Sequence, residues 1–251
     1  MSLKFSIITC SWNSELYLPR SIESVLGQDY PNIEYIFVDG GSDDGTLDLI
    51  QAIPKSVKLV TGIRGGISAA MNKGIELATG DVIAHLHSDD YYLHGRVISQ
   101  AAGVLDEYGA DWCFGRAKND VDNEVGPEAW IVPRYSYQRL LKGNFIPHVA
   151  TFVRKTVFGQ VGLFDIQRRY AMDYDMWLRI GKHYDPIQLD EHLGVFRRHS
   201  KSTSTANQME GLKESFQICL RHASKTPWTY LYHYAHFLVR KQRLQRKLSK
   251  G

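Results

Sequence analysis

We predict for this chain an α/β fold, in which a mostly parallel sheet is flanked by helices and followed by a helical C-terminal extension. Short apolar runs rich in Ile, Val and Phe recur at residues 5–9, 33–38, 57–60 and 82–86. Apolar residues with helical spacing lie between them, at residues 16–26 and 66–79. Strands that alternate with helices in this way are typical of a parallel sheet.

The second half of the sequence has a looser pattern. Residues 119–128 form a turn-rich acidic stretch that predicts a hairpin or a loop, and helical spacing returns at residues 136–142, 173–181 and 208–222. The chain has 251 residues, of which 43% are hydrophobic and 23% charged, which is enough for a sizeable core. Since no internal repeat or low-complexity linker interrupts it, we expect one domain over residues 1–204 and an extension over residues 205–251.

Composition excludes several classes of protein. No run reaches the roughly 18 to 20 apolar residues of a membrane-spanning helix, and the N-terminus does not resemble a secretory signal. The three cysteines, Cys10, Cys113 and Cys219, are far apart and lack C-x-x-C spacing. They therefore support neither a disulfide framework nor a zinc knuckle, and we expect a cytoplasmic protein.

Charge is distributed unevenly along the chain. The formal net charge is +3, but all 27 acidic residues lie at or before Glu214, and eight basic residues follow it. Aromatic residues from Trp228 onward precede the last basic run. This pattern suits either a helix lying on an anionic bilayer or a basic helix packed on the domain or on a second subunit. A nucleic-acid partner is not predicted, because no nucleic-acid motif accompanies the basic tail.

Acidic residues follow two of the predicted strands. Asp39 opens the segment VDGGSDDGT directly after one strand, and Asp89 and Asp90 end the segment HLHSDD after another. Each turn alone could cap the next helix, the first through Asp44 or Thr46. Ligands of open α/β sheets bind beyond the carboxyl ends of the strands. Together the two turns favour a site for ribose hydroxyls, a base N–H or a divalent cation.

Other chemistries lack their usual sequence signals. The patterns G-x-G-x-x-G, G-x-x-x-x-G-K-[ST], G-x-S-x-G and H-E-x-x-H are absent. A metallohydrolase remains an alternative, because His85, His87 and Asp89 could form a metal cluster at one strand end. No second histidine pair follows to complete a two-metal site.

Several motifs in order resemble bacterial family 2 glycosyltransferases of the GT-A fold, which has a Rossmann-like sheet. They are ITCSWNSELYLPRSIESVLGQDYPNIEYIFVDGGSDDGT, GISAAMNKGIELATGDVIAHLHSDD, NFIPHVATFVRKTVFGQVGLFD and YAMDYDMWLRI. The match covers about residues 5–204 and is most similar to enzymes that build O-antigen, capsule or exopolysaccharide. It implies a nucleotide-sugar-binding half at about residues 1–115 and an acceptor half at about residues 116–204.

The resemblance assigns donor-binding roles. It implies that Cys10 and Trp12 line the nucleobase pocket, that Asp39 accepts a hydrogen bond from the base, and that Arg64 reaches the base or a phosphate. Asp89, with Asp90 beside it, would hold the ribose and a divalent cation, Mn²⁺ or Mg²⁺. The family's first metal-site acid is replaced by His87, which leaves a catalytically silent sugar-nucleotide-binding module as another alternative.

The resemblance also assigns the acceptor side. Asp173 falls at the position of the general base, although Met172 stands where relatives often carry an acid. On a helix, Asp173 and Asp175 would point about 200° apart, so only one can face the cleft. A segment that closes over the diphosphate would include Arg198, His199, Ser202 and Ser204. His148 is either a ligand of donor or acceptor or a structural residue.

The activity that follows from the resemblance is inverting sugar transfer in one step. The donor would be a nucleotide sugar, with UDP favoured over GDP or dTDP. The acceptor would be a glycan or a polyprenyl-linked saccharide in surface polysaccharide biosynthesis. We therefore expect a cytoplasmic enzyme that can also bind peripherally to the inner face of the cell membrane.

Overall fold

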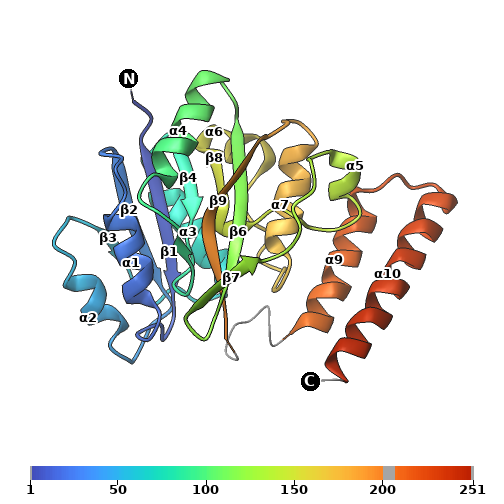
Figure 1. The fold of residues 1–251 in the computed structure, drawn as a ribbon, viewed down its shortest axis with the longest axis horizontal. Helices are drawn as coiled ribbons and strands as arrows, with labels where there is room; N and C mark the ends of the chain where they lie inside the picture. The colour runs from blue at the N-terminus through green and yellow to red at the C-terminus, as the bar shows by residue number, and fades with distance from the viewer. Residues whose placement is uncertain (1, 200–206, 250–251) are drawn as a thin grey trace.

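The computed structural model describes residues 2–199 and 207–249 and confirms the α/β fold. Four strands form the first part of its sheet: β1 (Phe5–Ser11), β2 (Ile33–Asp39), β3 (Lys58–Val60) and β4 (Val82–His85). They pair in the order β3-β2-β1-β4, and every pair is parallel. Their carboxyl ends therefore meet at one edge of the sheet (Figure 1).

Later strands extend the sheet on the other side of β4. They are β5 (Tyr91–Tyr92), β6 (Trp112–Val121), β7 (Glu124–Glu128), β8 (Thr151–Arg154) and β9 (Ile187–Arg198). The order continues β4-β8-β6-β9-β5, with β7 paired to β6. Only β6 and β9 pair in parallel here, so the complete sheet is mixed. The predicted hairpin at residues 119–128 is confirmed, and its turn residues Asp122 and Asn123 adopt positive φ angles of 53° and 66°.

Helices cover both faces of the sheet. The first half has α1 (Leu18–Leu26), α2 (Thr46–Gln51), α3 (Ile67–Leu77) and α4 (Val97–Glu107), and the second half has α5 (Tyr137–Leu140), η1 (His148–Ala150), α6 (Lys155–Val161) and α7 (Met172–Gly181). Alternate residues of β1 enter different cores: Phe5 and Ile7 join one, and Ile8 and Cys10 the other. Burial on both faces explains why these strands read as continuous apolar runs.

The C-terminal part of the chain is a helical hairpin of α9 (Gln208–His222) and α10 (Pro227–Leu248). Helix α9 packs on α7 and places Ile218 in the core, whereas α10 lies at the outer edge of the molecule (Figure 1). The two helices meet through stacked Phe216 and Phe237 rings, whose centroids are 4.5 Å apart. Among the described helices, none is long and apolar enough to cross a membrane.

Candidate active site

Asp39 organises the turn that follows β2. Its side chain is fully buried, and Oδ2 accepts hydrogen bonds from the hydroxyls of Ser11 at 2.8 Å and Ser42 at 2.6 Å. Oδ1 accepts from the backbone N–H groups of Gly41 and Ser42, both at 2.8 Å. Four partners fill the lone-pair sites of a carboxylate. In this conformation Asp39 therefore shapes the glycine turn and presents no oxygen to a ligand.

Trp12 and Arg64 flank the same glycine turn. Trp12 is 69% exposed, and its side chain lies against Gly40, where an added Cβ would come within 3.4 Å of it. Gly41 has a φ of 93°, and a Cβ there would lie 3.9 Å from Nη2 of Arg64. The structure thus brings an exposed aromatic ring and an exposed guanidinium to one sheet edge, where a nucleobase could stack and a phosphate could pair.

Cys10 lies beneath this edge. It is 5% exposed, packs in the same core cluster as Met71 of α3, and burial raises the pKa of its thiol to about 12. The thiol is therefore neutral, and its contact with a ligand would be limited to the small exposed part.

Asp89 pairs with His199, 110 residues later in the chain. Asp89 Oδ2 lies 3.0 Å from His199 Nε2, and the His199 ring packs on Tyr17 with centroids 4.4 Å apart. Burial alone would raise the pKa of Asp89, but the hydrogen bond with His199 and the nearby His87 hold it below its usual value. Two of the predicted site residues, one in the segment after β4 and one directly after β9, therefore meet in the structure.

Asp90 has a different environment from its neighbour. It is 3% exposed, and Oδ1 accepts a hydrogen bond of 3.0 Å from the Arg197 backbone N–H on β9. Burial, and then the charge of Asp89, raise the pKa of Asp90 well above its usual value. Asp89 is thus the member of the pair that can offer an ionised oxygen to a ligand.

Neither acid caps the next helix, because α4 begins only at Val97 and has no side-chain cap at Arg96. The helix-cap alternative for Asp89 and Asp90 is therefore wrong. In the first acidic turn Asp44 does bond the helix start, since Oδ1 accepts from the Thr46 backbone N–H at 3.0 Å.

A divalent cation would find few protein ligands here. Within residues 2–199 and 207–249, no three His, Cys, Asp or Glu side chains are grouped closely enough to hold a metal ion. Asp89 offers a carboxylate oxygen, the type of ligand that suits Mn²⁺ or Mg²⁺, and the His199 imidazole lies beside it. Such an ion would need further oxygen ligands from a diphosphate and water, as Mg²⁺ often has.

Three histidine rings from the two halves of the chain lie close together. The rings of His87 and His148 are 4.9 Å apart and nearly parallel at 6°, and His85 lies 5.6 Å from His148. Burial, and then the charge of His87, lower the pKa of His85 to about 3. The rings face one another, and within the described chain they are not part of a group of three metal-ligating side chains such as the metallohydrolase alternative expects.

His148 also connects this stack to α7, since its ring lies 5.6 Å from that of Trp177. Both of its ring nitrogens, and Nδ1 of His87, are buried without a hydrogen-bond partner among the described residues. Buried polar atoms normally have partners, which makes these three nitrogens candidates for contact with a ligand.

Asp173 stands in the first turn of α7. Oδ2 accepts from Asn144 Nδ2 at 2.8 Å, and Oδ1 accepts from the Tyr174 backbone N–H at 2.7 Å. Burial raises the pKa of Asp173 to about 6. The two hydrogen bonds lower this pKa, and the charge of the nearby Glu214 raises it. The carboxylate is thus ionised at neutral pH and more basic than an ordinary aspartate, which suits a general base.

A pocket of about 390 Å³ opens beside Asp173. It is lined by Asn144, Tyr170, Ala171, Asp173, Tyr174, Asn207, Gln208, Gly211, Leu212, Ser215, Arg240 and Leu244. Helices α9 and α10 therefore form one of its walls. A pocket of that volume is large enough to hold part of a small-molecule substrate.

Asp175 faces other surroundings, as its spacing from Asp173 predicts. It is 1% exposed, and its two oxygens contact Arg179 Nε at 2.8 Å and His222 Nε2 at 3.1 Å. Burial alone would raise the pKa of Asp175, but His222 and Arg179 lower it. Asp175 is therefore a structural residue that connects α7 to α9.

Glu214 of α9 is a residue that sequence reasoning missed. Its carboxylate accepts hydrogen bonds from the backbone N–H groups of Arg169, Tyr170 and Ala171, at 2.7 to 3.0 Å. The helical hairpin thus fixes the segment that precedes Asp173. No local pattern marks this contact, because its partners are more than 40 residues apart.

The end of β9 supplies the last predicted residues. Arg198 Nη2 donates to the Ala129 carbonyl at 3.3 Å, so its guanidinium lies over the β6–β7 side of the sheet. Ser202 and Ser204 lie outside the described residues.

Comparisons with known proteins identify the family of the chain. The family model described as "Glycosyl transferase family 2" matches residues 6–161. The chain is 31% identical over 191 residues to an uncharacterized glycosyltransferase of Mycobacterium tuberculosis, covering 73% of this chain and 71% of that protein. It is 30% identical over 180 residues to the PGL/p-HBAD biosynthesis glycosyltransferase of Mycobacterium bovis, covering 70% and 68%.

Solved structures share the fold. TarS 1-349 of S. aureus in complex with UDP-GlcNAc has a TM-score of 0.71 and 18% identity, covering 94% of this chain and 70% of that one. Mannosyltransferase PcManGT of Pyrobaculum calidifontis, in complex with GDP-Man and Mn²⁺, gives the same values. The family match over residues 6–161 and these relatives show that the chain belongs to glycosyl transferase family 2 and has its GT-A fold.

Proposed function

We propose that this glycosyltransferase transfers a sugar from a nucleotide-sugar donor to a saccharide acceptor with inversion at the anomeric carbon. The observation that carries the proposal is Asp173, a half-buried carboxylate with a pKa raised to about 6, which lines the large pocket on the acceptor side. Asp89 and His199 lie on the donor side, and the stack of His87 and His148 joins the two sides.

The donor would bind at the carboxyl edge of the parallel strands. Trp12 would stack on the base, Arg64 would pair with a phosphate, and Asp39 would keep the glycine turn open between them. UDP-linked sugars are the first donors to test, since TarS has been crystallised with UDP-GlcNAc, while the GDP-Man complex of PcManGT keeps a guanosine donor in the panel.

Asp89, together with His199, would hold the divalent cation. Such an ion stabilises the negative charge that develops on the leaving diphosphate. Asp90 would support Asp89 from the buried side, since the Arg197 backbone N–H fixes its orientation. His148 and His87 would donate or accept hydrogen bonds with hydroxyls of the transferred sugar through their unpartnered nitrogens.

The proposed reaction is a single displacement. Asp173 takes the proton from an acceptor hydroxyl, whose oxygen attacks the anomeric carbon. The bond from that carbon to the diphosphate oxygen breaks, and the nucleoside diphosphate leaves with the electron pair. Because the attack comes from the side opposite the leaving group, the configuration inverts.

The acceptor would be a polyprenyl-linked saccharide in surface polysaccharide biosynthesis, reached by an enzyme that rests on the inner face of the cell membrane. The exposed side of α10 supports this. Trp228 is 80% exposed and Leu231 58%, and with Leu238 and Val239 they lie on one face at 100° per residue. Lys241, Arg243 and Arg246 continue the helix, so an apolar stripe ends in cations, as in helices that lie on anionic bilayers.

A panel of nucleoside diphosphates, tested by thermal shift with and without Mn²⁺, examines the donor proposal. At a ligand concentration of 100 times Kd, binding adds about 2.7 kcal/mol of stability, or roughly 5 to 10 °C for a protein of this size. We expect one nucleotide to give this shift, and Trp12→Ala to reduce it. The absence of a shift for every nucleotide would contradict the donor site. Binding without any transfer or hydrolysis of the sugar would favour the silent module.

A further inference from the structure

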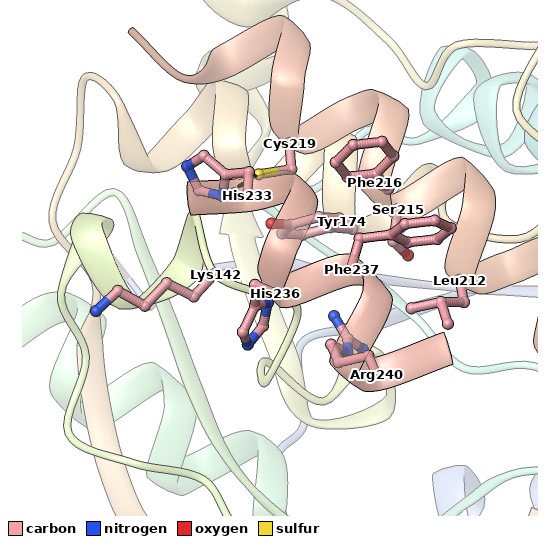
Figure 2. Close-up of a pocket in the computed structure, with 10 residues that line it drawn as sticks. All are labelled: Lys142, Tyr174, Leu212, Ser215, Phe216, Cys219, His233, His236, Phe237 and Arg240. Atoms are coloured by element: carbon pink, nitrogen blue, oxygen red, sulfur yellow. Dashed lines mark hydrogen bonds between the residues drawn. The ribbon is translucent and has the colours of Figure 1, made fainter. Parts of the chain in front are cut away.

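A cluster of basic side chains lies where α10, α9 and the segment after α5 meet (Figure 2). Lys142, His233, His236 and Arg240 line a small cavity of about 20 Å³ together with Tyr174, Leu212, Ser215, Phe216, Cys219 and Phe237. His233 is held by Cys219, whose Sγ lies 3.0 Å from its Nδ1. We call the four basic residues the basic cluster. None of the ten residues that line the cavity is acidic.

Lys142 and Arg240 carry the positive charge of the basic cluster, and neither forms an ion pair with a described acidic side chain. After Glu214 the sequence contains no Asp or Glu, and the Glu214 carboxylate already accepts three backbone hydrogen bonds. Over the described ranges, no ion pair joins a carboxylate to Lys142 or Arg240. Burial lowers the pKa of His236 most. The positive charge of Arg240, followed by the other cations nearby, lowers it further, as expected where like charges gather.

Arg240 connects the basic cluster to the acceptor pocket. It lines both the small cavity and the pocket of about 390 Å³ that contains Asp173. Of the described residues around the larger pocket, Arg240 is the one with a positive charge. Its Nη1 lies against the chain at Gly143, where an added Cβ would be 2.8 Å away. The Arg240 side chain therefore lies against the segment after α5 and lines the same pocket as the proposed base.

We propose that Arg240, backed by His236, forms a phosphate subsite in the acceptor pocket, so that the acceptor carries a phosphate or diphosphate group beside the sugar that is extended. A guanidinium can bind two phosphate oxygens at once, and the surrounding cations raise the attraction for an anion. The proposal rests on the proposed function, because it takes Asp173 as the base. It names the acceptor as a phosphorylated saccharide, such as a sugar linked to a lipid through diphosphate.

Calorimetric titration of the full chain with geranyl diphosphate tests the subsite directly, with geraniol as the uncharged control. We expect the diphosphate to bind at least tenfold more tightly than geraniol, and Arg240→Gln to remove most of this difference. Arg240→Lys should retain part of it, because the charge remains and the two-pronged contact is lost. Arg246→Gln is the matched control, since it removes a basic residue that is exposed on the same helix and lines neither pocket.

Two further measurements separate this subsite from other anion sites. Arg64→Gln, which alters the donor side, should leave geranyl diphosphate affinity unchanged, so a failure of the donor proposal would not be mistaken for a failure of this one. Vesicles of phosphatidylglycerol should bind wild type and Arg240→Gln equally. Equal affinity of wild type and Arg240→Gln for geranyl diphosphate would overturn the proposal. So would an effect of Arg240→Gln on vesicle binding alone, because the cluster would then recognise lipid headgroups.

Discussion

Replacing Asp173 by asparagine should slow sugar transfer and at the same time make the protein more stable. Burial raises the pKa of this carboxyl from 3.8 to about 6. Between these values the folded state binds the proton more tightly than the unfolded state, so the free energy of unfolding falls as the pH rises. At 1.36 kcal/mol per pH unit, the ionised carboxylate costs about 3 kcal/mol above pH 6.

Asparagine removes this cost because it carries no charge. It can no longer accept from both Asn144 and Tyr174 as the carboxylate does, and a lost hydrogen bond costs about 1 kcal/mol. Partial exposure of Asp173 to water reduces the gain further. We therefore expect Asp173→Asn to raise the free energy of unfolding by about 1 to 2 kcal/mol at pH 8, with the gain disappearing near pH 4. Turnover should fall by about 10² to 10⁴.

Chemical denaturation at pH 4, 6 and 8, together with transfer assays on the same preparations, measures both effects. In wild type, turnover should fall as the pH drops below about 6, because the base becomes protonated. A variant that is less stable than wild type at pH 8, or that keeps near-normal turnover, would refute the reasoning.

Four other substitutions give separate predictions. Asp175→Asn breaks the buried contacts to Arg179 and His222, so denaturation should show a loss of about 3 to 5 kcal/mol, while the folded variant keeps its turnover. In titration calorimetry, Asp89→Ala should abolish the effect of Mn²⁺ on nucleotide affinity. Asp39→Ala should weaken nucleotide affinity by about tenfold with or without Mn²⁺, because four hydrogen bonds of the glycine turn are lost. Unchanged affinity in both would exclude the donor site. Leu231→Glu should reduce sedimentation with anionic vesicles, whereas Ile131→Glu, exposed elsewhere, should not; equal binding would favour a structural role for α10.

The first half of the fold could be predicted from the sequence because its signals are local. The parallel strands are buried on both faces and read as apolar runs, and the helices between them show one apolar face, as Ile22 and Val25 do in α1. The second half lacks such signals. Strand β9 mixes charged and apolar residues, and its pairing with β6 shifts register near Arg116, so neither a run nor a strict alternation marks it.

The candidate site follows the same division. The sequence proposes Asp39 and Asp89 because they follow predicted strands, and Asp173 because it lies in a motif that resembles the family. The bonding of these residues could not be predicted. The four hydrogen bonds that enclose Asp39, the pairing of Asp89 with His199 and the support of α7 by Glu214 join segments that only the folded chain brings together. The sequence shows Arg240 only as part of a basic tail, whereas in the folded helical hairpin it lines the same pocket as Asp173.

The configuration of the transferred sugar tests the central claim most directly. Proton NMR can follow the anomeric signal of α-linked UDP-, GDP- and dTDP-sugars incubated with the protein, Mn²⁺ and an acceptor, with Asp173→Asn as the control. The proposed single displacement predicts that one donor is consumed by the wild type and that its α-linked sugar appears first in a β-linked product. Formation of an α-linked product, or donor consumption at the same rate by Asp173→Asn, would contradict the proposed mechanism.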